Sequence, residues 1–401
     1  MRSILRSVLV MTALAAGGGP AFGQTGTLTP AQMIRSLEFV QDAVVQGDHS
    51  AIEMQRHLIG LIDERLRGAS SDIFGDAANV DAALIYAMSG GNPETLAILA
   101  SRDSADRFDD RLVSILGRYL AGEGHLVGDE LVALLPDYRG DRIEPYLTLV
   151  AANLTAGNDP DRALRLFDWV RLLSPGTILE EAALRRSIFV ATRADLIDAG
   201  LIHAERYARR FLHSPYAGQF ADLFVDLVLK HPDAIEAEQI VGILGFMDIE
   251  RQRSVYLRIA RKAAISGNRE LAMIAAGRAE ELASDNPKAA ALAELYAGAA
   301  GVPSENVVEA AERLSGIDDT ALSERDRALQ RAARIIAEEV VRRPDTAALT
   351  SAVDDTPVTD PTAPVTDAGV PAEPLPDPVE DYVTSQRAVL EGIDALLEED
   401  R

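Results

Sequence analysis

Apolar residues recur at spacings of three and four from about residue 30 to residue 343 of this 401-residue chain, and alternating β-branched runs are missing. This period places an apolar stripe on one side of a helix, whereas a half-buried strand needs a period of two. Glycines and prolines divide the pattern into segments of mostly about 10 to 20 residues, a usual helix length. The chain is therefore predicted to be all-α, with roughly fifteen to eighteen helices.

Several helix starts carry a capping side chain followed by proline at the first helical position. They are Asn92-Pro93, Asp159-Pro160, Ser214-Pro215 and Asn286-Pro287. A further start, at Ser50, has Glu53 three residues later, which is the spacing of a capping box. These signals predict where the helices begin.

Paired helices of tetratricopeptide type are indicated by a recurring spacing of small and large apolar residues. Ala163, Phe167, Val170 and Pro175 have the steps of the second helix of such a pair, and Ala151 in the preceding segment allows a close approach. The same steps recur at Ala275, Ala279, Leu282 and Pro287, and a weaker copy occurs at Ala204, Ala208 and Phe211. Because the period is not constant, we predict an irregular helical-hairpin superhelix, with a helical bundle as the alternative.

The chain divides into five predicted regions. Residues 1–23 have the order of a secretory signal peptide: Arg2 and Arg6 precede a short apolar run, and small residues precede Gln24. An uncleaved membrane anchor is the alternative. An N-terminal helical region at 24–140 and a hairpin region at 141–343 follow. The mature chain is expected outside the cytoplasm and not inserted in the membrane.

The last two regions differ in composition from the rest. Residues 344–401 contain fourteen acidic and two basic residues, a net charge of −12. Residues 344–380 are rich in proline and threonine, which predicts a disordered linker. Residues 381–401 are predicted to form an amphipathic helix that docks either on its own body or in a partner's groove. Its apolar stripe consists of Val389, Leu390, Ile393, Leu396 and Leu397.

Charge and missing motifs exclude several function classes. The formal net charge of −24 makes nucleic acid and anionic membrane surfaces poor partners. With no cysteine, the chain has no disulfide, no thiolate nucleophile and no Cys-ligated metal. None of its six histidines pairs at zinc-helix spacing, and no phosphate loop or serine-nucleophile motif is present. We predict no catalytic residue, no metal and no cofactor.

Residues 207–224, YARRFLHSPYAGQFADLF, contain five of the twenty aromatic residues. Helical spacing places Tyr207 with Phe211 on one helix, and Phe220 with Phe224 on the next. We predict an aromatic joint between two helices in preference to a ligand site. Gly218 is expected to permit their close approach.

Candidate partner-binding residues come from this stretch and from the C-terminal stripe. Cationic side chains suit the end of the first helix, but they also fit an acidic partner. The candidates are Arg209, Arg210, Tyr216, Leu390, Ile393 and Leu397.

Four long runs resemble the MotC family of flagellar motility proteins of α-proteobacteria. They are residues 40–66, 79–93, 174–188 and 207–228, and a looser likeness continues to about residue 340. The resemblance implies a periplasmic protein required for flagellar rotation, which binds the periplasmic part of the stator protein MotB and is not an enzyme. It assigns no individual binding residue.

Two alternatives to this function stay open, and the oligomeric state is not predicted. One is a general envelope scaffold of tetratricopeptide type. The other is a peptidoglycan-acting enzyme related to superhelical lytic transglycosylases, although no segment resembles their catalytic domain.

Overall fold

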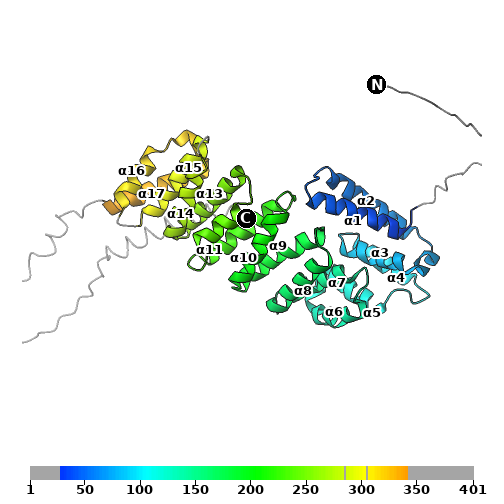
Figure 1. Ribbon diagram of the computed structural model, residues 1–401. Coiled ribbons are helices and arrows are strands. Elements are labelled where there is room, and N and C mark those ends of the chain that lie inside the picture. Colours follow the sequence, from blue (N-terminus) through cyan, green and yellow to red (C-terminus); the bar gives the residue numbers. More distant parts are fainter. Residues whose placement is uncertain (1–27, 284–285, 304–305, 342–401) are drawn as a thin grey trace, which may run out of the picture. The chain divides into compact units, whose positions relative to one another are not determined.

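A computed structural model describes residues 28–341 of the chain, apart from 284–285 and 304–305. These residues form seventeen α-helices joined by turns and short 3-10 or π segments, and they contain no strand (Figure 1). The prediction of an all-α fold is confirmed. The predicted signal peptide, linker and C-terminal helix, with Leu390, Ile393 and Leu397, lie outside the described residues.

The helices follow one another closely along the chain. The first nine are α1 (Pro30–Val45), α2 (Ala51–Arg67), α3 (Ala77–Met88), α4 (Pro93–Ser101), α5 (Asp110–Arg118), α6 (Gly128–Leu134), α7 (Glu144–Thr155), α8 (Pro160–Leu173) and α9 (Ile178–Arg193). The remaining eight are α10 (Ile197–Arg210), α11 (Ala217–Lys230), α12 (Ala237–Leu244), α13 (Ile249–Ile265), α14 (Arg269–Glu281), α15 (Pro287–Gly301), α16 (Val307–Gly316) and α17 (Glu324–Val341).

Successive helices pack as hairpins, most extensively α7 with α8, α9 with α10 and α13 with α14. The residues that predicted this pairing lie inside: Ala151, Ala163, Phe167 and Val170 are all fully buried. Small side chains at such positions let two helix backbones approach, and burial of the neighbouring large ones supplies the stabilisation.

Two hydrophobic cores meet at α9. The first core extends from α1 to α9 and includes Ala183 and Ala191 of that helix. The second consists of Val45 of α1 and of residues from α9 to α17, among them Leu184 and Ile188. One helix therefore contributes different faces to both cores. The division of the chain near residue 140 stays a prediction.

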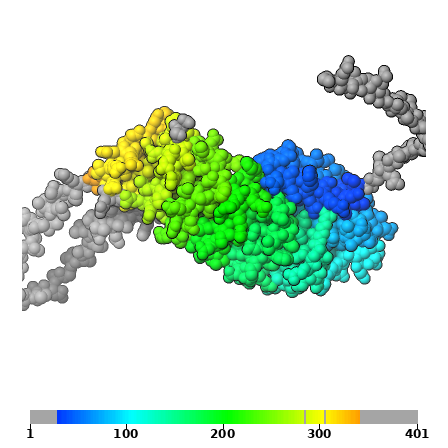
Figure 2. Space-filling view, viewed as in Figure 1, coloured from blue at the N-terminus to red at the C-terminus, as the bar shows by residue number. Residues whose placement is uncertain are grey.

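The α1–α2 hairpin ties the start of the chain to its middle. Gln46 Nε2 donates a hydrogen bond of 2.8 Å to the carbonyl oxygen of Gly176, and His49 Nε2 lies 3.0 Å from that of His213. Gly47 permits this contact because its φ of +110° disfavours other residues, and a Cβ would lie 3.0 Å from His213 Cβ. In Figure 2 the blue surface of this hairpin adjoins the green surface of the middle helices.

Three of the predicted helix caps are confirmed. Side-chain oxygens of Asn92, Asp159 and Asn286 each accept a hydrogen bond from a backbone N–H in the first turn of the following helix. In each case proline occupies the start of the helix, where its missing N–H has no cost.

The capping box predicted at Ser50 and the helix start predicted at Pro215 are wrong, although α2 does begin directly after Ser50. Ser50 already has helical backbone angles, and its hydroxyl and N–H both bond to the Asp48 carboxylate, so no capping box forms with Glu53. Helix α11 begins only at Ala217, so Pro215 is not its first residue. The Ser214 hydroxyl accepts from the Tyr216 N–H and forms a turn in place of a cap.

The aromatic joint is confirmed. Tyr207 of α10 stacks on Phe220 of α11 with ring centroids 4.3 Å apart, and Phe211 and Phe224 flank this pair. All four side chains are fully buried. The expected role of Gly218 is wrong, because nothing lies within 4 Å of a Cβ built there. Helix approach is set by the rings and by α9, which packs against both helices.

Candidate functional site: a groove between α10 and α12

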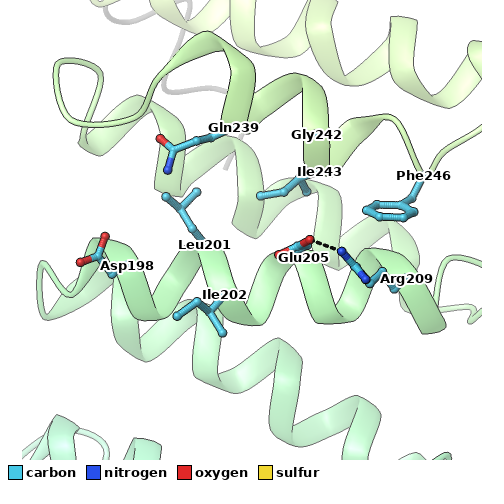
Figure 3. A pocket seen from close by; sticks show the side chains of 9 residues that line it. All are labelled: Asp198, Leu201, Ile202, Glu205, Arg209, Gln239, Gly242, Ile243 and Phe246. Carbon is cyan, nitrogen blue, oxygen red and sulfur yellow. Dashed lines mark hydrogen bonds and ion pairs between the residues drawn. The ribbon is translucent and has the colours of Figure 1, made fainter.

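An open groove of about 690 Å³ runs between α10 and α12, and we name it the α10–α12 groove (Figure 3). Its α10 wall carries residues at helical spacings of three and four, so they form one stripe. They are Asp198, Leu201, Ile202, Glu205 and Arg209. The opposite wall carries Gln239, Gly242 and Ile243 of α12, and Phe246 just after it.

The floor of the groove is apolar and its rim is accessible. Leu201 and Ile243 are nearly buried at the floor, whereas Ile202 is 47% exposed and Phe246 is 44% exposed. Large apolar side chains that are exposed beside buried ones favour binding, because an apolar group that covers them removes their surface from water. The arrangement suits an apolar anchor side chain of a protein partner.

Gly242 keeps the groove open on the α12 side. A Cβ at this helical position would meet no atom within 4 Å, so the space in front of it is empty. Glycine in a helix interior costs about 0.5–1 kcal/mol relative to alanine. Gly242 thus marks a position where a larger side chain would fill the groove without disturbing the core.

Arg209 fixes one end of the groove. Its guanidinium lies 5.2 Å from the centroid of the Phe246 ring and forms an ion pair with Glu205, one turn earlier on α10. A cation over an aromatic face contributes about 0.5–1 kcal/mol at an exposed site. Figure 3 shows Arg209 and Phe246 together at one end, with Asp198 and Gln239 at the other. The groove therefore has charged groups of both signs beside its apolar floor.

The other two candidates within the described residues do not line this groove. Arg210 bonds to both carboxylate oxygens of the buried Glu180, at 2.6 and 2.8 Å. Tyr216 is half-buried, and the Arg185 guanidinium lies 4.8 Å from its ring centroid. Both residues thus contact α9, so the structure brings neither of them together with Arg209.

The buried face of α10 holds a neutral histidine. Burial lowers the pKa of His203 from 6.5 to about 4, while the Asp168 carboxylate opposes that shift. Its Nδ1 has no hydrogen-bond partner among the described residues. This histidine is separated from the groove by the helix itself, and it affects stability and not the groove's chemistry.

Groups that could hold a metal ion were sought over the described residues. That part of the chain contains no group of three or more His, Cys, Asp or Glu side chains arranged to do so. The chemistry on view in the groove is that of a binding surface: apolar contacts, one ion pair and one cation over a ring.

Sequence reasoning missed most of the groove. Leu201, Ile202, Ile243 and Phe246 were not singled out, because each is an ordinary apolar residue in a helical pattern. One partial signal was the pair of apolar residues at the junction of α12 and α13, Phe246 and Ile249, which are both exposed. Exposed apolar residues at a helix end are typical of contact surfaces.

No helix within residues 28–341 combines the length and the apolar character that crossing a membrane requires. A search of solved structures gives no significant match to the chain.

Two comparisons with known sequences place the chain in a family. The family model described as chemotaxis protein MotC matches residues 1–401. A protein of Rhizobium meliloti (strain 1021) that is described as chemotaxis protein MotC is 52% identical over 343 residues, which cover 85% of this chain and 79% of that protein. The chain therefore belongs to the MotC family.

Proposed function

We propose that this protein is a periplasmic accessory protein of the flagellar motor, required for rotation, which binds the periplasmic part of the stator protein MotB in the α10–α12 groove. Membership of a family described by a chemotaxis name supports the motility role. The order of residues 1–23 supports export to the periplasm.

The observation that carries the proposed binding role is the open apolar stripe of the α10–α12 groove. Its buried floor and half-exposed rim resemble the centre of an interface, where a few apolar anchors supply most of the affinity. The Arg209–Glu205 ion pair at the edge of the groove is exposed, so its charges can attract charged side chains of a partner.

Binding acts on the motor through a difference in affinity. A protein that holds one conformation of the stator more tightly than another shifts the population toward the first. We therefore expect it to favour the torque-generating state of the stator. Equal affinity for stator variants locked in the plugged and open states would contradict this step.

The proposed function is tested first in cells. A strain with an in-frame deletion is expected to have filaments, seen by microscopy, that do not rotate, as scored by cell tracking. Normal swimming would contradict the motor role. Missing filaments would also contradict it, because they would indicate an assembly scaffold.

The groove is tested in the same strain with one substitution and a matched control. Gly242→Leu fills the groove and is expected to leave the cells paralysed while the protein accumulates normally. Gly277→Leu is the control, because Gly277 also lies in a helix with nothing within 4 Å of a Cβ but does not line the groove. It is expected to restore swimming; equal swimming of both variants would exclude the groove.

Export is tested separately by mass spectrometry of the protein from the periplasmic fraction. A mature chain beginning at Gln24 is expected. A full-length chain retained in the membrane fraction would show that the first residues act as an anchor.

A further inference from the structure

A second groove, between α13 and α15, is positively charged in a strongly acidic protein. It has a volume of about 350 Å³, and we name it the α13–α15 groove. Its described lining residues include four cationic side chains, Arg253, Arg258, Arg261 and Lys288, against the single carboxylate of Glu250. The formal charge of the whole chain is −24, so this groove departs sharply from the average surface.

The cations of the groove are only partly neutralised within the described residues. Arg258 pairs with Asp222 of α11, and Arg261 lies 3.7 Å from Asp326 of α17. Arg253 donates to a backbone carbonyl, that of Leu282, at 3.1 Å. Neither Arg253 nor Lys288 has an ion-pair partner in that part of the chain. The groove thus carries two positive charges that no carboxylate of the described residues neutralises.

The floor of the same groove is apolar. Leu257 and Leu292 are half-buried there, and the buried Tyr296 ring lies beside them with its hydroxyl bonded to Asp326 at 3.0 Å. A neighbouring hollow of about 330 Å³ shares Ser254 and Arg258 with the groove and extends it along α13. An apolar floor between cationic walls fits a helix that is apolar on one face and acidic on the other.

We propose that the α13–α15 groove is the docking site of this chain's own residues 381–401. That segment has six acidic and two basic residues, and the sequence spacing of its apolar stripe from Val389 to Leu397 predicts one apolar helical face. Its charge and its apolar stripe thus both complement the groove. This docking is independent of the proposed stator contact.

The intervening chain is long enough for this contact. Asp326, which bonds to Tyr296 of the groove, lies in the first turn of α17, and that helix ends at Val341, roughly 22 Å further along at about 1.5 Å per residue. Residues 342–380 number 39; a fully flexible chain of that length spans on the order of 35 Å, and a proline-rich one reaches further. A tether of this reach raises the effective concentration of the segment toward the millimolar range.

The absence of cysteine makes a direct test possible in the full-length protein. Cysteines introduced as Ser266→Cys, at the exposed end of α13 outside the groove, and Ser385→Cys in the segment can carry spin labels at two defined places. Pulsed electron spin resonance is expected to give one narrow distance distribution at low salt. A broad distribution in the parent protein would overturn the proposal.

Charge variants show whether the groove holds the segment. Arg253→Glu with Lys288→Glu is expected to broaden the distribution, and so is 1 M salt, at which charges are screened beyond about 3 Å. The matched control, Arg56→Glu with Arg165→Glu, makes the same charge change at exposed sites on α2 and α8 and is expected to keep the narrow peak. Circular dichroism checks that each variant is folded. An unchanged peak in the groove variant would overturn the proposal.

Two further arms identify the occupant. Leu390→Asp with Leu397→Asp is expected to abolish the narrow peak, because it places charges on the apolar stripe. A tenfold excess of unlabelled protein is expected to leave the peak unchanged. Loss of the peak on such dilution would show that the segment comes from a second copy, and would overturn docking within one chain. Gly242→Leu is expected not to alter the peak.

Discussion

The two faces of α10 come from the same fourteen residues, but one face is buried and the other lines an open groove. One face buries Ala204 and Tyr207 in the aromatic joint with α11. The other holds Ile202, Glu205 and Arg209 along the open groove toward α12. The aromatic face of α10 is thus the closed one, while the open face combines aliphatic side chains with Asp198, Glu205 and Arg209.

This difference teaches that the dense aromatic cluster of residues 207–224 is a buried joint and not a contact surface. The Tyr207 hydroxyl bonds to Glu181, itself fully buried and held by Arg185, so even the polar atoms of the joint are satisfied internally. A satisfied, closed surface has little left to offer a partner. The open face keeps its apolar area exposed, and the following predictions test that contrast.

The largest effect is expected at the centre of the joint. Phe220→Ala removes a fully buried ring stacked on Tyr207, and it should lower the free energy of unfolding by about 3–5 kcal/mol. Urea unfolding followed by circular dichroism measures it. Phe246→Ala, on the groove rim, is the comparison and should cost far less. Similar losses for the two variants would remove the distinction between the faces.

The second effect concerns pH and the closed face of α10. Because burial lowers the pKa of His203 to about 4, the unfolded chain takes up this proton first as the pH falls below 6.5. The stability that the neutral ring contributes is present above pH 6.5 and is lost toward pH 4. Between pH 7 and 4.5 the parent should lose about 2–3 kcal/mol more than His203→Leu.

Urea unfolding at the two pH values measures this difference, since acid effects of other groups are common to both proteins. Equal losses in parent and variant would mean that His203 is not kept neutral by burial.

A smaller effect is expected when only the hydroxyl of the joint is removed. Tyr207→Phe keeps the ring stack but deprives the Glu181 carboxylate of one donor, while Arg185 Nε remains at 3.0 Å. Hydrogen bonds to charged groups contribute about 1.5–3 kcal/mol. Chemical denaturation should show a loss in that range, with partner binding unaffected. Loss of binding would assign the joint a direct part in recognition.

The smallest stability effect is expected on the open face. Ile202→Asp changes a side chain that is already half-exposed, so the free energy of unfolding should change by no more than about 0.5 kcal/mol. Binding of the stator fragment, measured by calorimetry, should nevertheless fall about tenfold or more, because a charge enters the apolar stripe. A stable variant that binds with full affinity would show that the partner contacts another surface of the protein.

Much of the closed architecture could be read from local patterns. The helical period, the three proline-linked caps and the joint between residues 207 and 224 each depend on residues within about 20 positions of one another. The cap predicted at Ser50 failed because the Asp48 side chain, two residues earlier, competes for the same groups. Rules based on residue spacing do not say which of two neighbouring side chains will form the hydrogen bond.

The α10–α12 groove could not be predicted from local sequence patterns. Its walls come from α10 and α12, with all of α11 between them in the chain, and each wall alone has the pattern of an ordinary amphipathic helix. What makes a groove is the space in front of Gly242, which depends on how the two helices lie together. No spacing in the sequence reports that distance.

The most direct test of the account is the affinity of the purified full-length protein for the periplasmic part of MotB, measured for the parent, Gly242→Leu and Gly277→Leu. The account predicts that Gly242→Leu binds at least tenfold more weakly, although its free energy of unfolding is unchanged or higher, and that Gly277→Leu binds like the parent. Equal affinities for all three proteins would contradict the claim that the open face of α10 is the binding surface.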